Sequence, residues 1–216
     1  MTTALPEGFR YLPERFDRTA QATLLAAVLA AIENAGTPFH RFAMPKTGAL
    51  LSVSMTNLGP LGWVTDQARG YRYEPTHPAT GRPWGAMPTA LLALWEEVSG
   101  YPAPPQACLV NHYTEGTKLG LHVDWDEEAT DAAVVSVSLG DDALFRLGGP
   151  SRRDPTRSMR LRSGDVVVLG GAARRCHHGV DRIYPGTSRL VSSRLPRGGR
   201  INLTLRRVTP PEDRPL

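Results

Sequence analysis

The chain lacks the features of exported and membrane proteins. Its 216 residues include only two cysteines, Cys108 and Cys176, which argues against a disulfide scaffold and suits a reducing compartment. No basic segment followed by an apolar core opens the sequence, and the most apolar stretch, residues 20–32, is short for a membrane span. With 41% apolar residues, the composition predicts a globular protein. Without an export signal, the cytoplasm is the expected compartment.

Lysine is missing from the last third of the chain. Residues 146–216 carry 16 arginines against 5 acidic residues, whereas residues 1–145 carry 9 basic and 16 acidic residues. Arginine binds phosphate and carboxylate through paired hydrogen bonds and stacks on bases. The charge is therefore compatible with nucleic-acid binding and equally with a solvated, arginine-rich surface.

Periodicity predicts two helices followed by many short strands. Asp17 or Thr19 can cap a helix that ends at Gly36, and a second helix begins near Pro88 and ends before Gly100. From Ala107 onward, β-branched and alternating segments are separated by turn residues. These segments read ACLVNHY, KLGLHVDW, AAVVSVSL, LFRLG, MRLRS, DVVVLGG and RINLTLRRV.

This order of elements predicts an α+β fold whose β part is a sandwich or jelly roll. We expect a single domain over residues 1–216, with the jelly-roll core at residues 107–208. Residues 44–84 mix alternation with glycine, proline and aromatic residues, and we expect strands or a lid over the mouth of the barrel. Residues 209–216 should be disordered.

The segment LGLHVDWDEE carries the main chemical signal. In a strand, His122 and Asp124 share one face, while Leu121, Val123 and Trp125 would point into a core. His178 follows much later, in RCHHGV. Two histidines and a carboxylate can hold non-haem Fe(II) with open positions for reactants. The same set can bind Zn²⁺, and any one of these histidines alone is more often structural.

The last strand, RINLTLR, alternates polar and apolar side chains. Its polar face contains Arg200, Asn202, Thr204 and Arg206. If this face lines a cavity, the arginines need anionic partners, which a dicarboxylate ligand would supply. An ordinary solvent-facing strand is the alternative. Asn111 and Tyr113 also share one face and can hydrogen-bond a carboxylate.

Together these motifs resemble the AlkB family of Fe(II)/2-oxoglutarate-dependent dioxygenases, most closely its bacterial DNA-repair branch. The landmarks occur in order between Met44 and Arg207. They are MTNLGPLGW, GYRYEP, ACLVNHY, GTKLGLHVDWDE, VVSVSLG, the R-x-D-P segment at residues 152–155, GDVVVLGG, HHGV and RINLTLR. The chain departs from the family at Leu169 and Cys176, where relatives often have aromatic residues.

The resemblance implies a double-stranded β-helix (jelly-roll) core with a nucleotide-recognition lid. It implies that Fe(II) is held by His122, Asp124 and His178, which form the catalytic centre. It implies that 2-oxoglutarate is held by Asn111, Tyr113, Arg200, Asn202 and Arg206. The substrate is expected to contact Met55, Trp63, Tyr71, Tyr73, Asp126 and Arg152. The target base would stack between Trp63 and His122. Either Tyr71 or Tyr73 could be the tyrosine that contacts the nucleotide.

The activity implied is oxidative demethylation of N-alkylated bases, such as 1-methyladenine and 3-methylcytosine, with O2 as cosubstrate. The products would be formaldehyde, succinate and CO2. Single-stranded DNA is the first expected substrate because the methyl group lies on the pairing edge of the base. Double-stranded DNA or RNA is a further option, and we expect a monomer.

Two alternatives stay open at the level of sequence. The same iron site could oxidise a small molecule or a protein side chain, because metal ligands do not define the substrate. The chain could also be a non-enzymatic nucleic-acid-binding module with structural histidines, although that leaves the Arg200 and Arg206 face unexplained.

Overall fold

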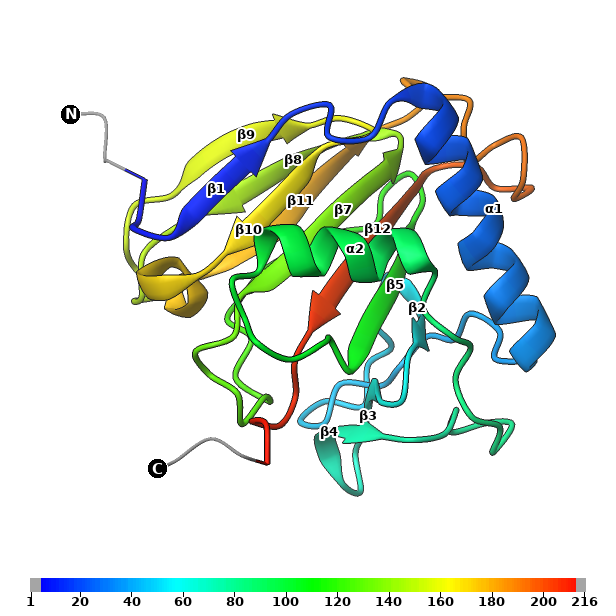
Figure 1. The fold of residues 1–216 in the computed structure, drawn as a ribbon, viewed down its shortest axis with the longest axis horizontal. Helices are drawn as coiled ribbons and strands as arrows, with labels where there is room; N and C mark the ends of the chain where they lie inside the picture. Colours follow the sequence, from blue (N-terminus) through cyan, green and yellow to red (C-terminus); the bar gives the residue numbers. More distant parts are fainter. Residues whose placement is uncertain (1–4, 213–216) are drawn as a thin grey trace.

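The computed structural model describes residues 5–212 and consists of two antiparallel sheets, a separate hairpin and two helices (Figure 1). The larger sheet has the order β1 (Phe9–Leu12), β10 (Val166–Leu169), β7 (Val134–Gly140), β12 (Arg200–Arg206), β5 (Ala107–Tyr113) and β2 (Ser54–Leu58). The smaller sheet has the order β6 (Leu119–His122), β11 (His178–Tyr184), β8 (Asp142–Leu147) and β9 (Arg157–Leu161). The hairpin joins β3 (Gly62–Asp66) to β4 (Gly70–Glu74).

The predicted helices are present, with the predicted ends. In α1 (Arg18–Ala35), the Asp17 carboxylate accepts a hydrogen bond of 2.8 Å from the backbone N–H of Ala20. Gly36 closes the helix at φ 66°, a left-handed conformation that glycine adopts without steric cost. The second helix, α2 (Thr89–Val98), begins directly after Pro88. A short 3-10 helix, η1 (Gly171–Arg175), precedes β11.

Two hydrophobic cores hold these layers together. In the first, Leu25 of α1 and Trp95 of α2 pack with Val137 and Leu203 of the larger sheet, so both helices cover the outer face of that sheet (Figure 1). The second core lies between the sheets and includes Leu109, Val167, Phe145 and Val180. The two sheets therefore face each other, as the jelly-roll prediction requires.

Strand β12 is buried on both faces, one apolar and one polar. The side chains of Ile201, Leu203 and Leu205 belong to the core under the helices. Its polar residues point the other way, between the sheets, and Arg200 has no exposed surface. The alternative of a solvent-facing strand is therefore wrong, and the larger sheet supplies a polar wall inside the sandwich.

Several expectations from the sequence need correction. Strand β6 ends at His122, so the alternation does not continue and Trp125 is 63% exposed instead of lying in a core. Leu121 and Val123 are only half-buried. Strands β1 and β11 were not predicted. Within the segment at residues 44–84, β2 pairs with β5 in the larger sheet, while β3 and β4 stand apart.

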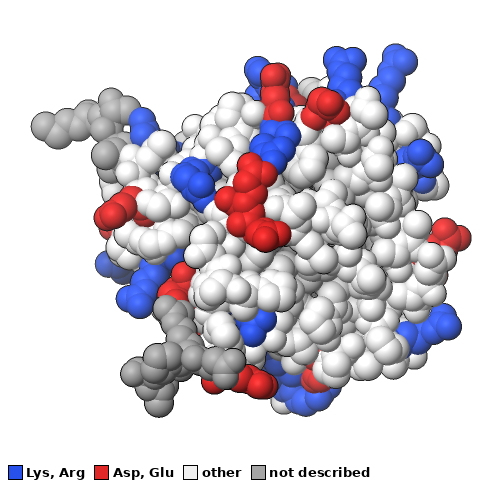
Figure 2. All heavy atoms as spheres, viewed as in Figure 1, with Lys and Arg blue, Asp and Glu red and all other residues white. Residues whose placement is uncertain are grey.

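None of the helices in residues 5–212 is long and apolar enough to cross a bilayer. The face that carries α1 and α2 shows scattered basic side chains, mostly toward its edges (Figure 2). Residues 213–216, part of the tail expected to be disordered, lie outside the described residues.

Candidate metal centre and cosubstrate site

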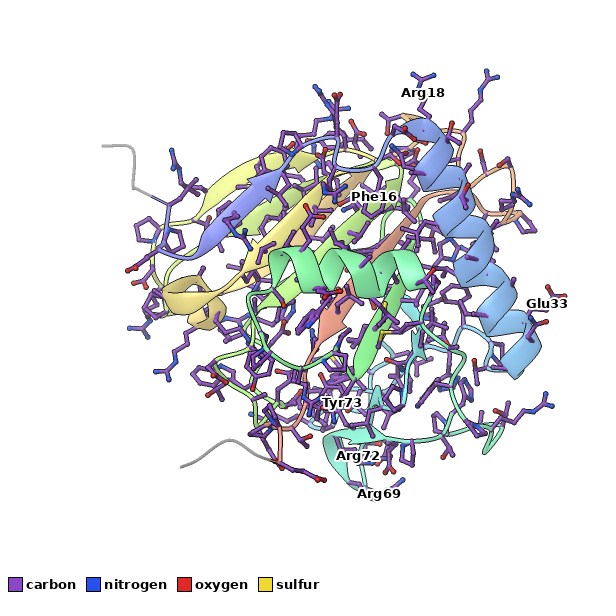
Figure 3. The ribbon with its side chains drawn as sticks, viewed as in Figure 1. Phe16, Arg18, Glu33, Arg69, Arg72 and Tyr73 are labelled. Carbon is purple, nitrogen blue, oxygen red and sulfur yellow. The ribbon has the colours of Figure 1, made fainter. Side chains whose placement is uncertain are left out.

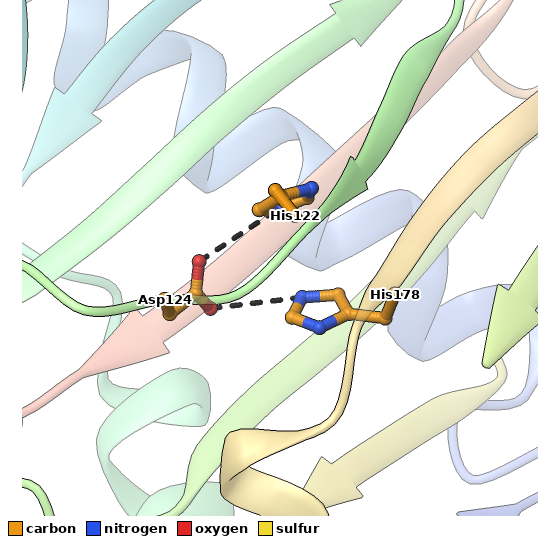
Figure 4. A group of neighbouring side chains, drawn as sticks. All are labelled: His122, Asp124 and His178. Carbon is orange, nitrogen blue, oxygen red and sulfur yellow. Dashed lines mark ion pairs between the residues drawn. The ribbon is translucent and has the colours of Figure 1, made fainter. Parts of the chain in front are cut away.

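His122, Asp124 and His178 meet at the edge of the smaller sheet that β6 and β11 form. His122 ends β6 and His178 begins β11, and the two residues are register partners in adjacent strands. Their Nε2 atoms lie 3.6 and 3.7 Å from the two carboxylate oxygens of Asp124 (Figure 4). One ligand atom from each residue falls within 4.8 Å of the others, a spacing at which one metal ion could touch all three.

The histidine rings are oriented by backbone carbonyls. The Nδ1 of His122 lies 2.9 Å from the carbonyl oxygen of Gly120, and the Nδ1 of His178 lies 3.1 Å from that of Cys176. Because a carbonyl can only accept, each Nδ1 donates its proton, and in the neutral imidazole that tautomer leaves the lone pair on Nε2. This arrangement aims both Nε2 atoms at the common centre, which is how metal-binding histidines are held by their neighbours.

The electrostatics of Asp124 and His178 favour metal binding. Burial lowers the pKa of His178 to about 4, with further lowering by His122, so its imidazole is neutral near pH 7. Burial alone would raise the pKa of Asp124, but Arg206 and the two histidines hold it well below its usual range. The Asp124 Oδ2 atom is buried and has no hydrogen-bond partner. The neutral imidazole of His178, the Nε2 atom of His122 and an ionised carboxylate with an unpartnered oxygen form a ligand set that fits Fe(II).

The inner face of β5 and β12 forms the second half of the site. Arg200 is the register partner of Tyr113, and Asn202 is the register partner of Asn111, so four of the five residues expected to hold 2-oxoglutarate form two adjacent cross-strand pairs. Asn202 donates to the Val137 carbonyl at 2.8 Å. The alternation of polar and apolar residues along β5 and β12 therefore buries these polar side chains and also brings them together.

Arg200 is a buried cation without a carboxylate partner among the ion pairs of residues 5–212. Its guanidinium donates to the Asp141 carbonyl at 3.2 Å and to the Ser138 hydroxyl at 2.5 Å, and its Nε has no partner. Burial lowers its pKa to about 10. The Asn111 Oδ1 atom nearby on this face is also buried and unpartnered. An unpaired buried guanidinium is costly, and a carboxylate of a small dicarboxylic acid would satisfy it.

Arg206 differs from Arg200 because it already has anionic partners. Its guanidinium donates to Asp124 at 2.7 Å and to Glu127 at 2.9 Å. It thereby connects the polar wall to the metal centre. The two arginines, which the sequence presents as equivalent, thus occupy different electrostatic environments, and only Arg200 lacks a protein anion.

The β3–β4 hairpin is attached to the segment that follows Asp124. Trp63 donates from Nε1 to the Asp126 carboxylate at 2.7 Å, and its ring stacks on Tyr71 with centroids 5.5 Å apart. Tyr71 is half exposed, whereas Tyr73 reaches inward and donates to Glu127. Figure 3 shows Tyr73 on the hairpin with Arg69 and Arg72. The hairpin therefore places the Trp63 and Tyr71 rings against the segment that begins at the candidate metal ligand Asp124.

Two further residues of this network were missed by sequence reasoning. Glu127 is buried and accepts hydrogen bonds from Arg206, Tyr73 and Arg174, the last at 2.7 Å. Arg174 also donates to the backbone carbonyl of Asp124 at 2.6 Å. In the sequence, Glu127 belongs to an acidic run and Arg174 to a basic pair, patterns that usually indicate solvated surface.

The two remaining residues expected to contact the substrate, Met55 and Arg152, lie at strands of different sheets. Met55 is buried in β2, where it is the register partner of Asn111. Arg152 donates to the backbone carbonyl of Leu121 at 3.0 Å, which places its guanidinium against strand β6.

Comparisons with known proteins agree with this geometry. The sequence profile described as "2OG-Fe(II) oxygenase superfamily" matches residues 8–206. Over 206 residues, the chain is 54% identical to the alpha-ketoglutarate-dependent dioxygenase AlkB homolog of Caulobacter vibrioides, covering 95% of this chain and 90% of that protein. It is 43% identical to alpha-ketoglutarate-dependent dioxygenase AlkB of Escherichia coli over 176 residues, covering 80% and 78% of the two chains.

A solved structure shares the fold over nearly the whole chain. OsALKBH1 superposes with a TM-score of 0.75 at 31% identity, covering 95% of this chain and all of that one. The chain belongs to the 2OG-Fe(II) oxygenase superfamily. Within it, the protein is an AlkB-type 2-oxoglutarate-dependent dioxygenase, and the superfamily implies Fe(II) and 2-oxoglutarate as its reactive partners. The non-enzymatic binding module is thereby rejected.

Proposed function

We propose that this chain removes methyl groups oxidatively from N-alkylated nucleobases such as 1-methyladenine and 3-methylcytosine, with single-stranded DNA as the first substrate. The observation that carries the proposal is the position of the Trp63–Tyr71 stack, which is attached through Asp126 to the segment that follows Asp124. More distant relatives are named as a DNA N(6)-methyladenine demethylase in Arabidopsis thaliana and a tRNA demethylase in Schizosaccharomyces pombe. RNA and double-stranded DNA are the further substrates to compare.

Two groups of residues would bind the reactants of the proposed reaction. His122, Asp124 and His178 would hold Fe(II), and Arg200, Asn111, Tyr113, Asn202 and Arg206 would hold 2-oxoglutarate. Iron with 2-oxoglutarate and O2 supplies the oxidising power that hydroxylates a methyl group while 2-oxoglutarate becomes succinate and CO2. The hydroxymethyl group then leaves the nitrogen as formaldehyde, and the base recovers its normal pairing edge.

The residues of the chain would select a cationic, extruded base. Methylation at the pairing edge gives these bases a positive charge, which favours stacking on the face of Trp63 through cation–π attraction. The Asp126 carboxylate beside Trp63 would stabilise the same charge. Tyr71 would contact the nucleotide, with Arg152 on the phosphate backbone and Met55 lining the pocket. Tyr73 would instead position the hairpin, because its hydroxyl bonds to Glu127.

We further propose that the β3–β4 hairpin is the part of residues 44–84 that forms the lid, and that the chain acts as a single domain. Strand β2 is part of the larger sheet, whereas the hairpin pairs only within itself among the sheets. The hairpin contacts the metal side through the Trp63–Asp126 and Tyr73–Glu127 hydrogen bonds. On its other side, Asn57 of β2 bonds to the backbone of Trp63, and Val64 is buried in the core between the sheets.

The proposal is tested by incubating the protein with Fe(II), 2-oxoglutarate, O2 and an oligonucleotide that carries 3-methylcytosine. We expect formaldehyde and succinate in equal amounts and a base that has lost one methylene. Asp124→Ala should abolish both products. If succinate forms without base repair, the protein is still an oxygenase, but its substrate is a small molecule or a protein side chain.

A further inference from the structure

Trp125 has the largest exposed fraction of the large apolar side chains in residues 5–212. It is 63% exposed, compared with 50% for Tyr71 and 39% for Leu92. Isolated exposed leucines are ordinary on protein surfaces, but tryptophan carries the largest apolar area and is highly buried on average. A tryptophan left in solvent beside a metal centre therefore calls for a binding partner.

The residues on either side of Trp125 are fixed by their own contacts. Asp124 belongs to the metal centre and bonds to Arg206, and Asp126 accepts from Trp63. Glu127 is held by Arg174 and Arg206. The backbone of Trp125 is thus anchored on both sides, while its ring is the one side chain of this run, from Asp124 to Glu127, that is both apolar and exposed. This is the arrangement of a preorganised contact residue.

The surroundings of Trp125 suit a nucleic-acid strand. On the side of the hairpin, Tyr71 stacks on Trp63 and is half exposed. On the side of β6, Arg152 donates to the carbonyl of Leu121 and remains exposed. The elements that contact the segment of Trp125 on its two sides thus carry an exposed aromatic ring and an exposed arginine. Proteins hold single strands by stacking bases on aromatic rings and placing phosphates near cations.

We propose that Trp125 stacks on the nucleobase next to the target base in the same strand. The inference rests on the proposed function, because it assumes that the target base enters beside Trp63. Removing the target base from the strand exposes a face of its neighbour, and a flat apolar ring at the rim would cover that face. Trp125 would then be a substrate-positioning residue that distinguishes a polynucleotide from a free nucleotide, without preference for a particular neighbouring base.

The test compares the wild type with Trp125→Ala, Trp125→Phe and, as a control on the outer side of α2, Leu92→Ala. Each protein is given 3-methylcytosine as a mononucleotide, within an oligonucleotide, and within an oligonucleotide whose neighbouring positions are abasic. We expect Trp125→Ala to lower kcat/KM for the intact oligonucleotide roughly tenfold more than for the mononucleotide, mainly through KM. Trp125→Phe should restore most of the loss, and Leu92→Ala should resemble the wild type.

The abasic oligonucleotide separates stacking from other roles. With the abasic oligonucleotide, kcat/KM of the wild type should fall to the value of Trp125→Ala. The kcat/KM of Trp125→Ala should change little, because this variant has already lost the ring on which the neighbouring base would stack. The dependence of binding on salt should be the same for both proteins, since no phosphate contact is removed. Additive losses, or an equal loss on mononucleotide and oligonucleotide, would overturn the inference.

Binding measured by fluorescence anisotropy with the same oligonucleotides keeps the two proposals distinguishable. If the wild type repairs no methylated base, the proposed function fails, and equal binding of intact and abasic strands would then also remove the role of Trp125. The alternative is that Trp125 binds another protein molecule. Association of the wild type with itself that disappears in Trp125→Ala, together with unchanged oligonucleotide binding, would assign the ring to a protein interface.

Discussion

Single residues of the site divide into those that lack partners and those that hold the others in place. Arg200 and Asn111 have buried polar atoms without hydrogen-bond partners, so they are poised for a ligand. Glu127 and Arg174 have their charges paired and fix the position of Arg206. We therefore expect substitution of the unpartnered residues to lower ligand affinity, and substitution of the paired residues to lower the stability of the fold.

The Arg200 side chain should determine the affinity for 2-oxoglutarate. Arg200→Met keeps a long side chain but removes the buried charge, so we expect KM for 2-oxoglutarate to rise about 10- to 100-fold, as the loss of a charged hydrogen bond predicts. Stability should change little, because the free protein leaves this guanidinium without a carboxylate. Arg182→Met, at an exposed position on β11, serves as the control. An unchanged KM would place the cosubstrate elsewhere.

The Glu127 carboxylate should matter most for stability. Glu127→Ala leaves the buried Arg174 and Arg206 without one of their partners, and breaking such an arrangement costs about 3–5 kcal/mol. Urea unfolding measures this loss. The neighbouring Glu128→Ala removes an exposed carboxylate and should change the free energy of unfolding by less than about 0.5 kcal/mol. Similar values for the two variants would contradict the buried network.

At the scale of elements, local signals in the sequence predicted the helices well. The N-cap and the terminal glycine of α1 act within one turn, so they are readable without tertiary information. Strands β1 and β11 escaped prediction because β1 is only four residues long and β11 places Asp181 and Arg182 side by side. Their pairing with β10 and β8 is a long-range property.

The site itself could be predicted only in part, for a related reason. The alternating face of β12 follows from spacing within one strand. The two-residue step from His122 to Asp124 brings the two residues together, but Asp124 lies beyond the end of β6 and not on a strand face. The link from the hairpin to Glu127 depends on contacts between segments that lie far apart in sequence. Trp125 was misplaced because the end of β6 at His122 depends on pairing with β11 and not on local propensity.

The first turn of α1 offers a test of the local signals. Two residues could cap this helix in the sequence, and in the structure Asp17 accepts the hydrogen bond from Ala20. Asp17→Ala should therefore lower the free energy of unfolding by about 1 kcal/mol, whereas Thr19→Ala should have a smaller effect. Urea denaturation of the two variants decides between them, and a larger loss for Thr19→Ala would contradict the observed cap.

For the whole molecule, the two sheets bring together groups that cannot be satisfied without ligands. Binding of a metal ion and 2-oxoglutarate to the folded state alone should therefore stabilise the protein through mass action. With Mn²⁺ as a redox-inert stand-in and 2-oxoglutarate well above their dissociation constants, we expect Tm to rise by about 5 °C or more. Asp124→Ala should lose most of the shift. A shift of the same size in that variant would mean that the ligands bind at another place.

We propose that Fe(II) and 2-oxoglutarate, held by polar residues of the two facing sheets, oxidise a methyl group on a base that stacks on Trp63. The most direct measurement is the mass of a 3-methylcytosine oligonucleotide after reaction with the Fe(II)-loaded protein, with and without 2-oxoglutarate. We predict the loss of one methylene that requires 2-oxoglutarate and disappears in Asp124→Ala. An unchanged mass while succinate accumulates would contradict the claim.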